Sequence, residues 1–132
     1  MNTRVKMKNL QLLISAIVVI AVSFVYGFNP SEILPAVFGF EVTAVDLKNI
    51  FRAIMGLYIF FGVFWIVGIV KSRFWEAATL SNILFMGGLA SGRIISTFAD
   101  GISKQFLIGA FLELIMMFWG IYNLKKYKSK IR

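Results

Sequence analysis

Four long apolar runs, separated by short polar or basic segments, constrain this chain more than any other feature of its sequence. The runs cover residues 10–28, 49–70, 74–98 and 105–124. Each is at or near the roughly 20 residues that a helix needs to cross a hydrocarbon core about 30 Å thick. None of them alternates apolar and polar residues, as the strands of a β-barrel would. The sequence therefore predicts an all-α fold, a four-helix transmembrane bundle that forms a single domain over residues 1–132.

The composition agrees with lipid as the solvent. Hydrophobic residues make up 59% of the chain and charged residues only 15%, against about 45–50% and about 25% in soluble domains. A soluble protein of 132 residues has too little interior to bury so much apolar surface. The chain has neither cysteine nor histidine, which excludes disulfides, thiolate chemistry and the usual zinc and haem ligands. We expect no metal and no cofactor.

Basic residues are distributed unevenly between the two sides of the predicted bundle. The N-terminal segment, the turn at residues 71–73 and the C-terminal tail hold ten of them, whereas the two opposite loops hold only Lys48 and Lys104. This positive-inside bias predicts that both termini lie in the cytoplasm. It also accounts for the net charge of +8 without a nucleic-acid partner, because no basic face carries interleaved aromatic residues.

The first external loop carries helix signals of its own. Its residues 29–32 have Asn, Pro and Glu in the order typical of a helix start, and Gly39 is typical of a helix end. We therefore predict a short interfacial helix that runs to Phe38. Residues 43–46 then have the spacing of a capping box, with Asp in place of the usual Glu or Gln, which would begin the second long helix.

Four charged side chains lie in or against the apolar runs, where such residues usually face the bundle interior and pair with each other. They are Arg52, Arg93, Asp100 and Glu113. A short turn joins the third and fourth runs, so their helices are expected to be antiparallel neighbours. Counted from that turn at 1.5 Å per residue, Arg93 and Glu113 lie at heights that differ by about 5 Å. We predict that these two residues form an ion pair.

Helical periodicity brings neutral polar residues onto the same faces as these charges. If the faces converge, a polar cluster forms in the outer half of the bundle, which could stabilise the bundle or bind a ligand. An anionic or hydroxylated headgroup could then compete for an arginine of this cluster. The candidate ligand-binding residues are Asn49, Arg52, Tyr58, Asn82, Arg93, Ser96, Asp100 and Glu113.

The glycines and the large aromatic residues suggest plainer roles. Gly88 and Gly92 form a small-xxx-small pair, which lets helix backbones approach closely in lipid. Gly68 has no small residue four positions away, so we expect Gly92→Leu to disrupt packing more than Gly68→Leu. Most of the 14 phenylalanines and three tryptophans are expected to face lipid or the membrane interface.

Two arginine-centred motifs stand in the second and third runs, followed by Glu113 in the fourth. They read Asn49-x-x-Arg52-Ala53-x-Met55-Gly56-x-Tyr58 and Gly87-Gly88-x-x-x-Gly92-Arg93-x-x-Ser96-x-x-x-Asp100-Gly101. With these motifs, the chain resembles a family of short bacterial membrane proteins over about residues 34–120. That family is described only as a domain of unknown function. The resemblance implies four spans and a polar cluster at these positions, and we expect a multi-pass protein of a bacterial inner membrane.

The sequence is compatible with three functions. The first is a non-enzymatic membrane protein whose buried polar pocket binds or passes a small amphiphile or a lipid headgroup. The second is a structural or accessory subunit, in a homo-oligomer or with another membrane protein, whose charged cluster serves assembly alone. The third is a membrane-embedded acid/base enzyme that uses Glu113, although no nucleophile or cofactor motif accompanies that residue.

Overall fold

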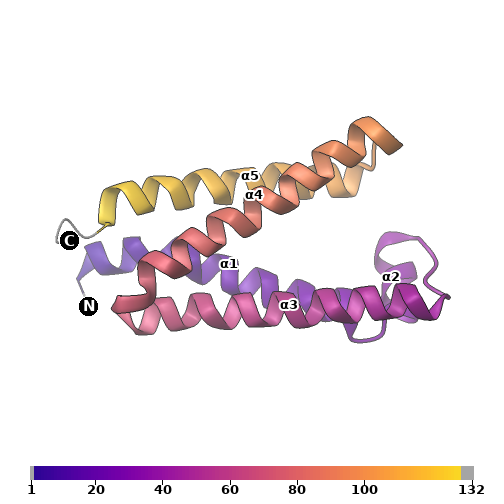
Figure 1. Cartoon of the computed structure of the whole chain (residues 1–132), viewed down its shortest axis with the longest axis horizontal. Coiled ribbons are helices and arrows are strands. Elements are labelled where there is room, and N and C mark those ends of the chain that lie inside the picture. The colour runs from indigo at the N-terminus through magenta and orange to yellow at the C-terminus, as the bar shows by residue number, and fades with distance from the viewer. Residues whose placement is uncertain (1, 129–132) are drawn as a thin grey trace.

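The computed structural model describes residues 2–128, and every regular element in that range is helical (Figure 1). Four of the helices are long and apolar enough to cross a membrane. The prediction of an all-α bundle with four transmembrane helices is confirmed. The elements, in chain order, are α1 (Thr3–Gly27), α2 (Pro30–Phe38), α3 (Val45–Val70), the 3-10 turn η1 (Ser72–Phe74), α4 (Trp75–Asp100) and α5 (Lys104–Tyr127).

The long helices form two pairs, α1 with α3 and α4 with α5. Figure 1 shows α4 starting beside the end of α3 and diverging from it along its length. The guanidinium of Arg4 lies 5.8 Å from the centre of the Tyr127 ring, so the first and last helices meet at one end of the bundle. We call that end, which also holds η1, the inner end. The opposite end, with α2 and the α4–α5 turn, is the outer end.

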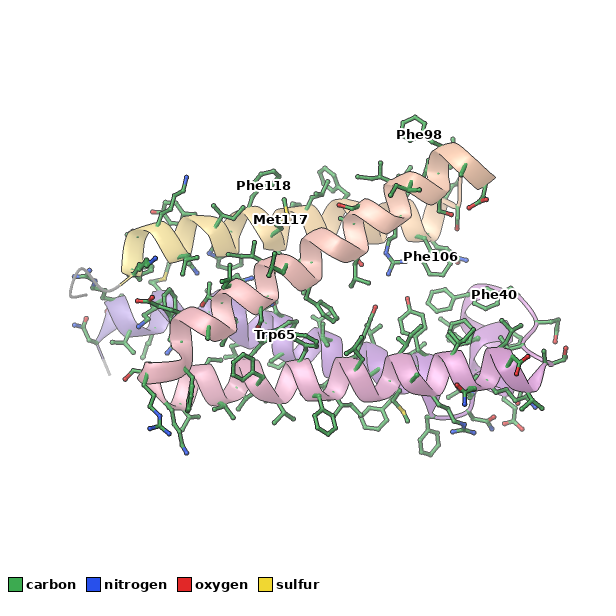
Figure 2. The ribbon with its side chains drawn as sticks, in the orientation of Figure 1. Phe40, Trp65, Phe98, Phe106, Met117 and Phe118 are labelled. Carbon is green, nitrogen blue, oxygen red and sulfur yellow. The ribbon has the colours of Figure 1, made fainter. Side chains whose placement is uncertain are left out.

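The outward faces of the helices are apolar, as lipid requires. Phe98 and Phe118 are 88% and 62% exposed, and Figure 2 shows both side chains pointing away from the bundle. Two tryptophans do not follow the expected pattern. Trp65 and Trp75 are buried, and the indole of Trp65 donates a hydrogen bond to Ser81 Oγ at 3.0 Å. The expectation that tryptophans face lipid or the interface is wrong for these two.

Close helix contacts seal the inner half of the bundle. A Cβ atom added at Gly68 would collide with Cβ of Ala78, so α3 and α4 touch at this point through a glycine. A Cβ at Gly62 would lie 2.6 Å from Cγ1 of Ile20, which marks a similar approach of α3 to α1. These close approaches narrow the space between α3 and its neighbours in the inner half.

A buried amide pair ties α1 to the other helix pair in this inner half. Gln11 Nε2 donates hydrogen bonds to Asn82 Oδ1 at 2.6 Å and to the backbone oxygen of Met116 at 3.1 Å. Both amide side chains are fully buried. Within residues 2–128, Gln11 Oε1 and Asn82 Nδ2 have no hydrogen-bond partner. Asn82 therefore belongs to the inner half, and its predicted place in an outer polar cluster is wrong.

The local signals of the first loop are confirmed in part. Helix α2 begins at Pro30 and is followed by Gly39, whose φ of 78° is left-handed, as predicted for the short interfacial helix. The predicted capping box is wrong, because Ala44 rather than Thr43 is the N-cap of α3, and it makes no side-chain cap. The negative charge of Asp46 in the first turn remains favourable for the helix dipole.

Candidate ligand-binding site in the outer half

The divergence of the helix pairs leaves a cleft of about 520 Å³ in the outer half. Its α3 wall consists of Phe51, Ile54 and Tyr58, which share one helical face because they are three and four residues apart. Tyr26 of α1 joins this wall, with its ring centre 6.1 Å from that of Phe51 and 5.8 Å from that of Tyr58. The wall is therefore apolar apart from two phenol hydroxyls.

The α4 wall presents small residues to the cleft. Gly88, Gly92 and Ser96 follow each other at every fourth position, line the cleft and are exposed. A Cβ atom added at Gly88 or at Gly92 would meet nothing within 4 Å. The prediction that this glycine pair brings two helices close together is wrong for the described chain. The missing side chains widen the cleft instead.

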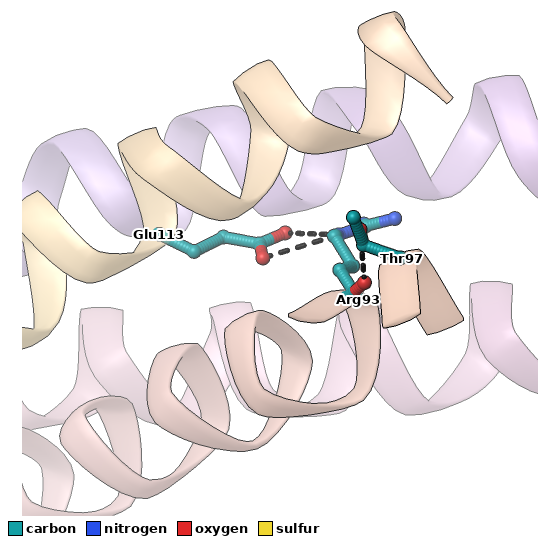
Figure 3. A network of polar contacts seen from close by, with 3 residues as sticks. All are labelled: Arg93, Thr97 and Glu113. Carbon is teal, nitrogen blue, oxygen red and sulfur yellow. Dashed lines mark hydrogen bonds and ion pairs between the residues drawn. The ribbon is translucent and has the colours of Figure 1, made fainter. Parts of the chain in front are cut away.

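A neighbouring face of α4, with Arg93 and Thr97, carries the charge of the site. Arg93 Nε donates to both carboxylate oxygens of Glu113, at 3.0 and 3.1 Å (Figure 3). The predicted pairing across α4 and α5 is confirmed. The two side chains are only 20% and 13% exposed, so the pair is largely shielded. One turn towards the outer end, Thr97 Oγ1 donates to the backbone oxygen of Arg93 at 2.8 Å.

The ion pair occupies little of what the guanidinium can offer. An arginine has five N–H donors, of which four are on Nη1 and Nη2. The contacts with Glu113 use Nε alone, and Glu113 is the one carboxylate paired with Arg93 among residues 2–128. The Tyr26 side chain is the other hydrogen-bonding neighbour of the guanidinium, and the Phe106 ring lies 5.1 Å from Cζ. Most of the donors are therefore left for an acceptor inside the cleft.

Arg52, the second predicted arginine, lies elsewhere. Its Nη1 donates to the backbone oxygens of Gly27 and Phe28 at 3.0 and 3.1 Å, where the end of α1 leaves carbonyl groups without helical partners. Asn49 is exposed and does not line the cleft. The expectation that both arginines and both carboxylates converge in one cluster is wrong, because Arg52 is engaged with the end of α1.

The remaining predicted residues divide between the cleft and its rim. Tyr58 is buried and Ser96 is exposed, and both line the cleft. Asp100 is exposed at the end of α4 and accepts a hydrogen bond from Ser96 Oγ at 2.9 Å. The structure thus brings Tyr58, Arg93, Ser96 and Glu113 together. Asp100 stands at the rim.

Four aromatic residues of the cleft were not predicted as site residues, namely Tyr26, Phe40, Phe51 and Phe106. Phe40 and Phe106 lie on opposite sides of the outer opening, with ring centres 6.5 Å apart (Figure 2). The expectation that phenylalanines mostly face lipid or the interface is wrong for these two. Their positions depend on how the first loop folds back over α5, which helical periodicity does not report.

The comparisons with known proteins bear on the whole chain. Residues 7–124 match the family model described as domain of unknown function DUF4345. Neither the curated proteins nor the solved structures include a significant match. Since the matched range reaches into all four long helices and contains both arginine motifs, the chain belongs to the DUF4345 family.

Proposed function

We propose that this member of the DUF4345 family binds a small amphiphile with an oxyanion head, a carboxylate or a phosphate, in the outer-half cleft. The observation that carries the proposal is an aromatic-lined cleft of about 520 Å³ into which one arginine brings unused donors. Pockets for small molecules typically have volumes of about 300–1,000 Å³ and mostly apolar walls with few polar groups. The cleft fits that description, and Arg93 is the one cation that lines it among residues 2–128.

The geometry of the ion pair supports an oxyanion as the ligand. Glu113 holds the guanidinium from the Nε side, so a second oxyanion can bind Nη1 and Nη2 without displacing it. Such a contact can be bidentate and charge-assisted, which makes it about twice as strong as a neutral hydrogen bond. The hydroxyls of Tyr26 and Tyr58 are further donors on the facing wall. If the added negative charge is unfavourable, Glu113 can take up a proton, whereas arginine cannot lose one.

The proposal also includes an orientation and a location. With its inner end in the cytoplasm, as the ten-to-two distribution of basic residues favours, the cleft opens at the level of the outer leaflet. The proposed membrane is the bacterial inner membrane, and the ligand would come from its outer leaflet or from outside.

A structural or accessory role is the second candidate. It is supported by the neutrality of the Arg93–Glu113 pair, which needs no ligand to balance its charge. An acid/base reaction at Glu113 has less support, because both of its oxygens accept from Arg93 Nε. The structural role predicts a stoichiometric protein partner and no retained small molecule.

Native mass spectrometry of the protein purified in mild detergent separates these functions. We expect the wild type to retain an acidic amphiphile and Arg93→Gln to lose it. Arg73→Gln, which removes an arginine from the exposed inner turn, is the matched control and should behave as the wild type. Equal retention by Arg93→Gln would contradict the proposal, and a protein partner without any small molecule would favour the structural role.

A further inference from the structure

The outer opening of the cleft is bridged by the first loop. The Phe38 ring, at the end of α2, lies 5.1 Å from the Phe106 ring in the first turn of α5. Next to this contact, Gln105 Nε2 donates to the backbone oxygen of Phe38 at 3.2 Å. Phe40 and Phe106 face each other beside it (Figure 2). These contacts join α2 to α5 across the top of the cleft and narrow the way in from the aqueous side.

The side of the cleft between α3 and α4 is open. Gly88 and Gly92 line the cleft and are also exposed, so the cleft reaches the outer surface of the bundle along this edge of α4. Nothing stands within 4 Å of where their Cβ atoms would be. Across the gap, Ile54 and Tyr58 of α3 form the facing wall. Figure 1 shows α3 and α4 diverging here.

The polar and apolar parts of the cleft lie at different depths. The Arg93 guanidinium is next to Phe106, the third residue of α5, and therefore close to the outer end. Gly88 is five residues further down α4, which places it about 8 Å deeper. An amphiphile in the outer leaflet has the same order, with its charged head at the surface and its chain below.

We infer that the hydrocarbon chain of the ligand enters sideways from the outer leaflet, through the gap between α3 and α4 over Gly88 and Gly92, while its oxyanion head binds Arg93. This inference rests on the proposed function and narrows its ligand to a single-chain amphiphile, such as a fatty acid or a lysophospholipid, because a cleft of about 520 Å³ has the size of a pocket for one small molecule. A chain that passes from lipid into an apolar cleft gains little from the hydrophobic effect. The head must therefore provide the selectivity, through the guanidinium.

Photolabelling in phosphatidylcholine liposomes tests the route. The probe is palmitic acid with a diazirine in the middle of its chain, and labelled peptides of the full-length protein are mapped by mass spectrometry. A parallel probe, lysophosphatidic acid with the same chain, distinguishes a phosphate head from a carboxylate. We expect label on Ile54 and Tyr58 of α3 and on residues 88–92 of α4, removed by excess unlabelled ligand.

Two glycine variants provide the matched comparison. Gly92→Phe fills the gap and should reduce the competed label about tenfold, which corresponds to about 1.4 kcal/mol. Gly56→Phe adds the same side chain to α3. A Cβ atom at Gly56 also meets nothing within 4 Å, but Gly56 does not line the cleft. This variant should therefore be labelled like the wild type. Thermal unfolding checks that both variants are folded, and Gly88→Phe replaces Gly92→Phe if the latter is not.

The outcomes separate the inference from the function it rests on. If Gly92→Phe carries undiminished competed label, or if the competed label is absent from the α3 and α4 walls of the gap, the chain does not pass between α3 and α4, and the sideways route is overturned while binding stands. If wild-type label from both probes is resistant to competition and spread over lipid-facing residues such as Phe60 and Phe118, which are exposed, the proposed function fails as well.

Discussion

Between α3 and α4, the inner and outer halves of this bundle use glycine in opposite ways, whereas α1 and α3 touch in the outer half too, where a Cβ atom added at Gly27 would collide with Met55. In the inner half, glycine lets α3 touch α4 at Ala78, and the polar groups are neutral amides sealed between helices. In the outer half, Gly88 and Gly92 face an open cleft, and the polar group is a guanidinium. The comparison indicates that a glycine has no fixed meaning in a membrane helix. Its role depends on whether a neighbouring helix is there to meet it.

This difference follows from how the helices cross. Helices α3 and α4 are joined by the short turn η1 and must be close at the inner end. As they diverge, the space between them grows with distance from that turn (Figure 1). The inner half is therefore closely packed. The outer half has room for a ligand, and its aromatic walls and single arginine give that room a chemical preference.

The largest effect we predict concerns which end of the bundle faces the cytoplasm. A reporter fused after Arg132 should be active on the cytoplasmic side, and the same reporter inserted at Glu41 in the outer loop should be active on the opposite side. The ten-to-two distribution of basic residues is the physical reason. If the fusion after Arg132 reports the external side, the outer half has been assigned to the wrong leaflet.

The next largest effect separates the two kinds of glycine. Gly68→Leu forces a side chain against Ala78 and should cost about 3 kcal/mol, at the upper end of what overpacking usually costs. Gly92→Leu should stay within about 1 kcal/mol of the wild type, because its side chain enters open space. Thermal unfolding in detergent measures both. Equal losses would show that the outer cleft is as tightly packed as the inner half.

From the sequence, Gly92→Leu was expected to disrupt packing more than Gly68→Leu, and the structure reverses that order. The spacing of Gly88 and Gly92 is typical of close helix contacts, and Gly68 has no such spacing. Spacing reports which residues share a face of one helix, but not whether a second helix covers that face. The same limit explains Asn82 and Arg52, whose partners belong to α1, a helix whose position against them the spacing does not report.

Features that depend on neighbouring segments could be predicted from the sequence. The bounds of α2 follow from Pro30 and Gly39, which are local signals. The Arg93–Glu113 pair follows from the short turn between α4 and α5, which fixes both their antiparallel packing and their relative heights. The aromatic walls of the cleft could not be predicted, because they come from α1, the first loop and α5 as well as from α3. Their convergence depends on the crossing of the two helix pairs.

A medium effect is expected at the ion pair. Glu113→Gln should reduce the free energy of unfolding by about 2 kcal/mol, because it leaves a permanent cation in a shielded place. Arg93→Gln should cost less, since Glu113 can then become protonated. The double variant should recover part of the sum of the two losses. Strictly additive losses in denaturation experiments would mean that the two side chains do not interact in the folded protein.

The smallest changes in stability are expected from removing one polar contact in each half. Gln11→Leu should cost about 1–2 kcal/mol because it strands the buried Asn82 amide, and adding Asn82→Leu should restore much of the loss. Ser96→Ala removes an exposed hydrogen bond to Asp100 and should change stability by no more than about 0.5 kcal/mol. If the two single variants cost the same, the inner half is not the better sealed of the two.

The central claim, that Arg93 gives the outer cleft a preference for an oxyanion, is tested most directly by comparing two ligands of equal chain length. Thermal unfolding is followed in detergent with palmitic acid or with hexadecanol, which has no charge. For the wild type, the acid at saturating concentration should raise Tm by about 5 °C or more, and the alcohol should raise it much less. In Arg93→Gln the advantage of the acid should disappear. Equal shifts from acid and alcohol in the wild type, or an acid advantage that survives in Arg93→Gln, would contradict the account.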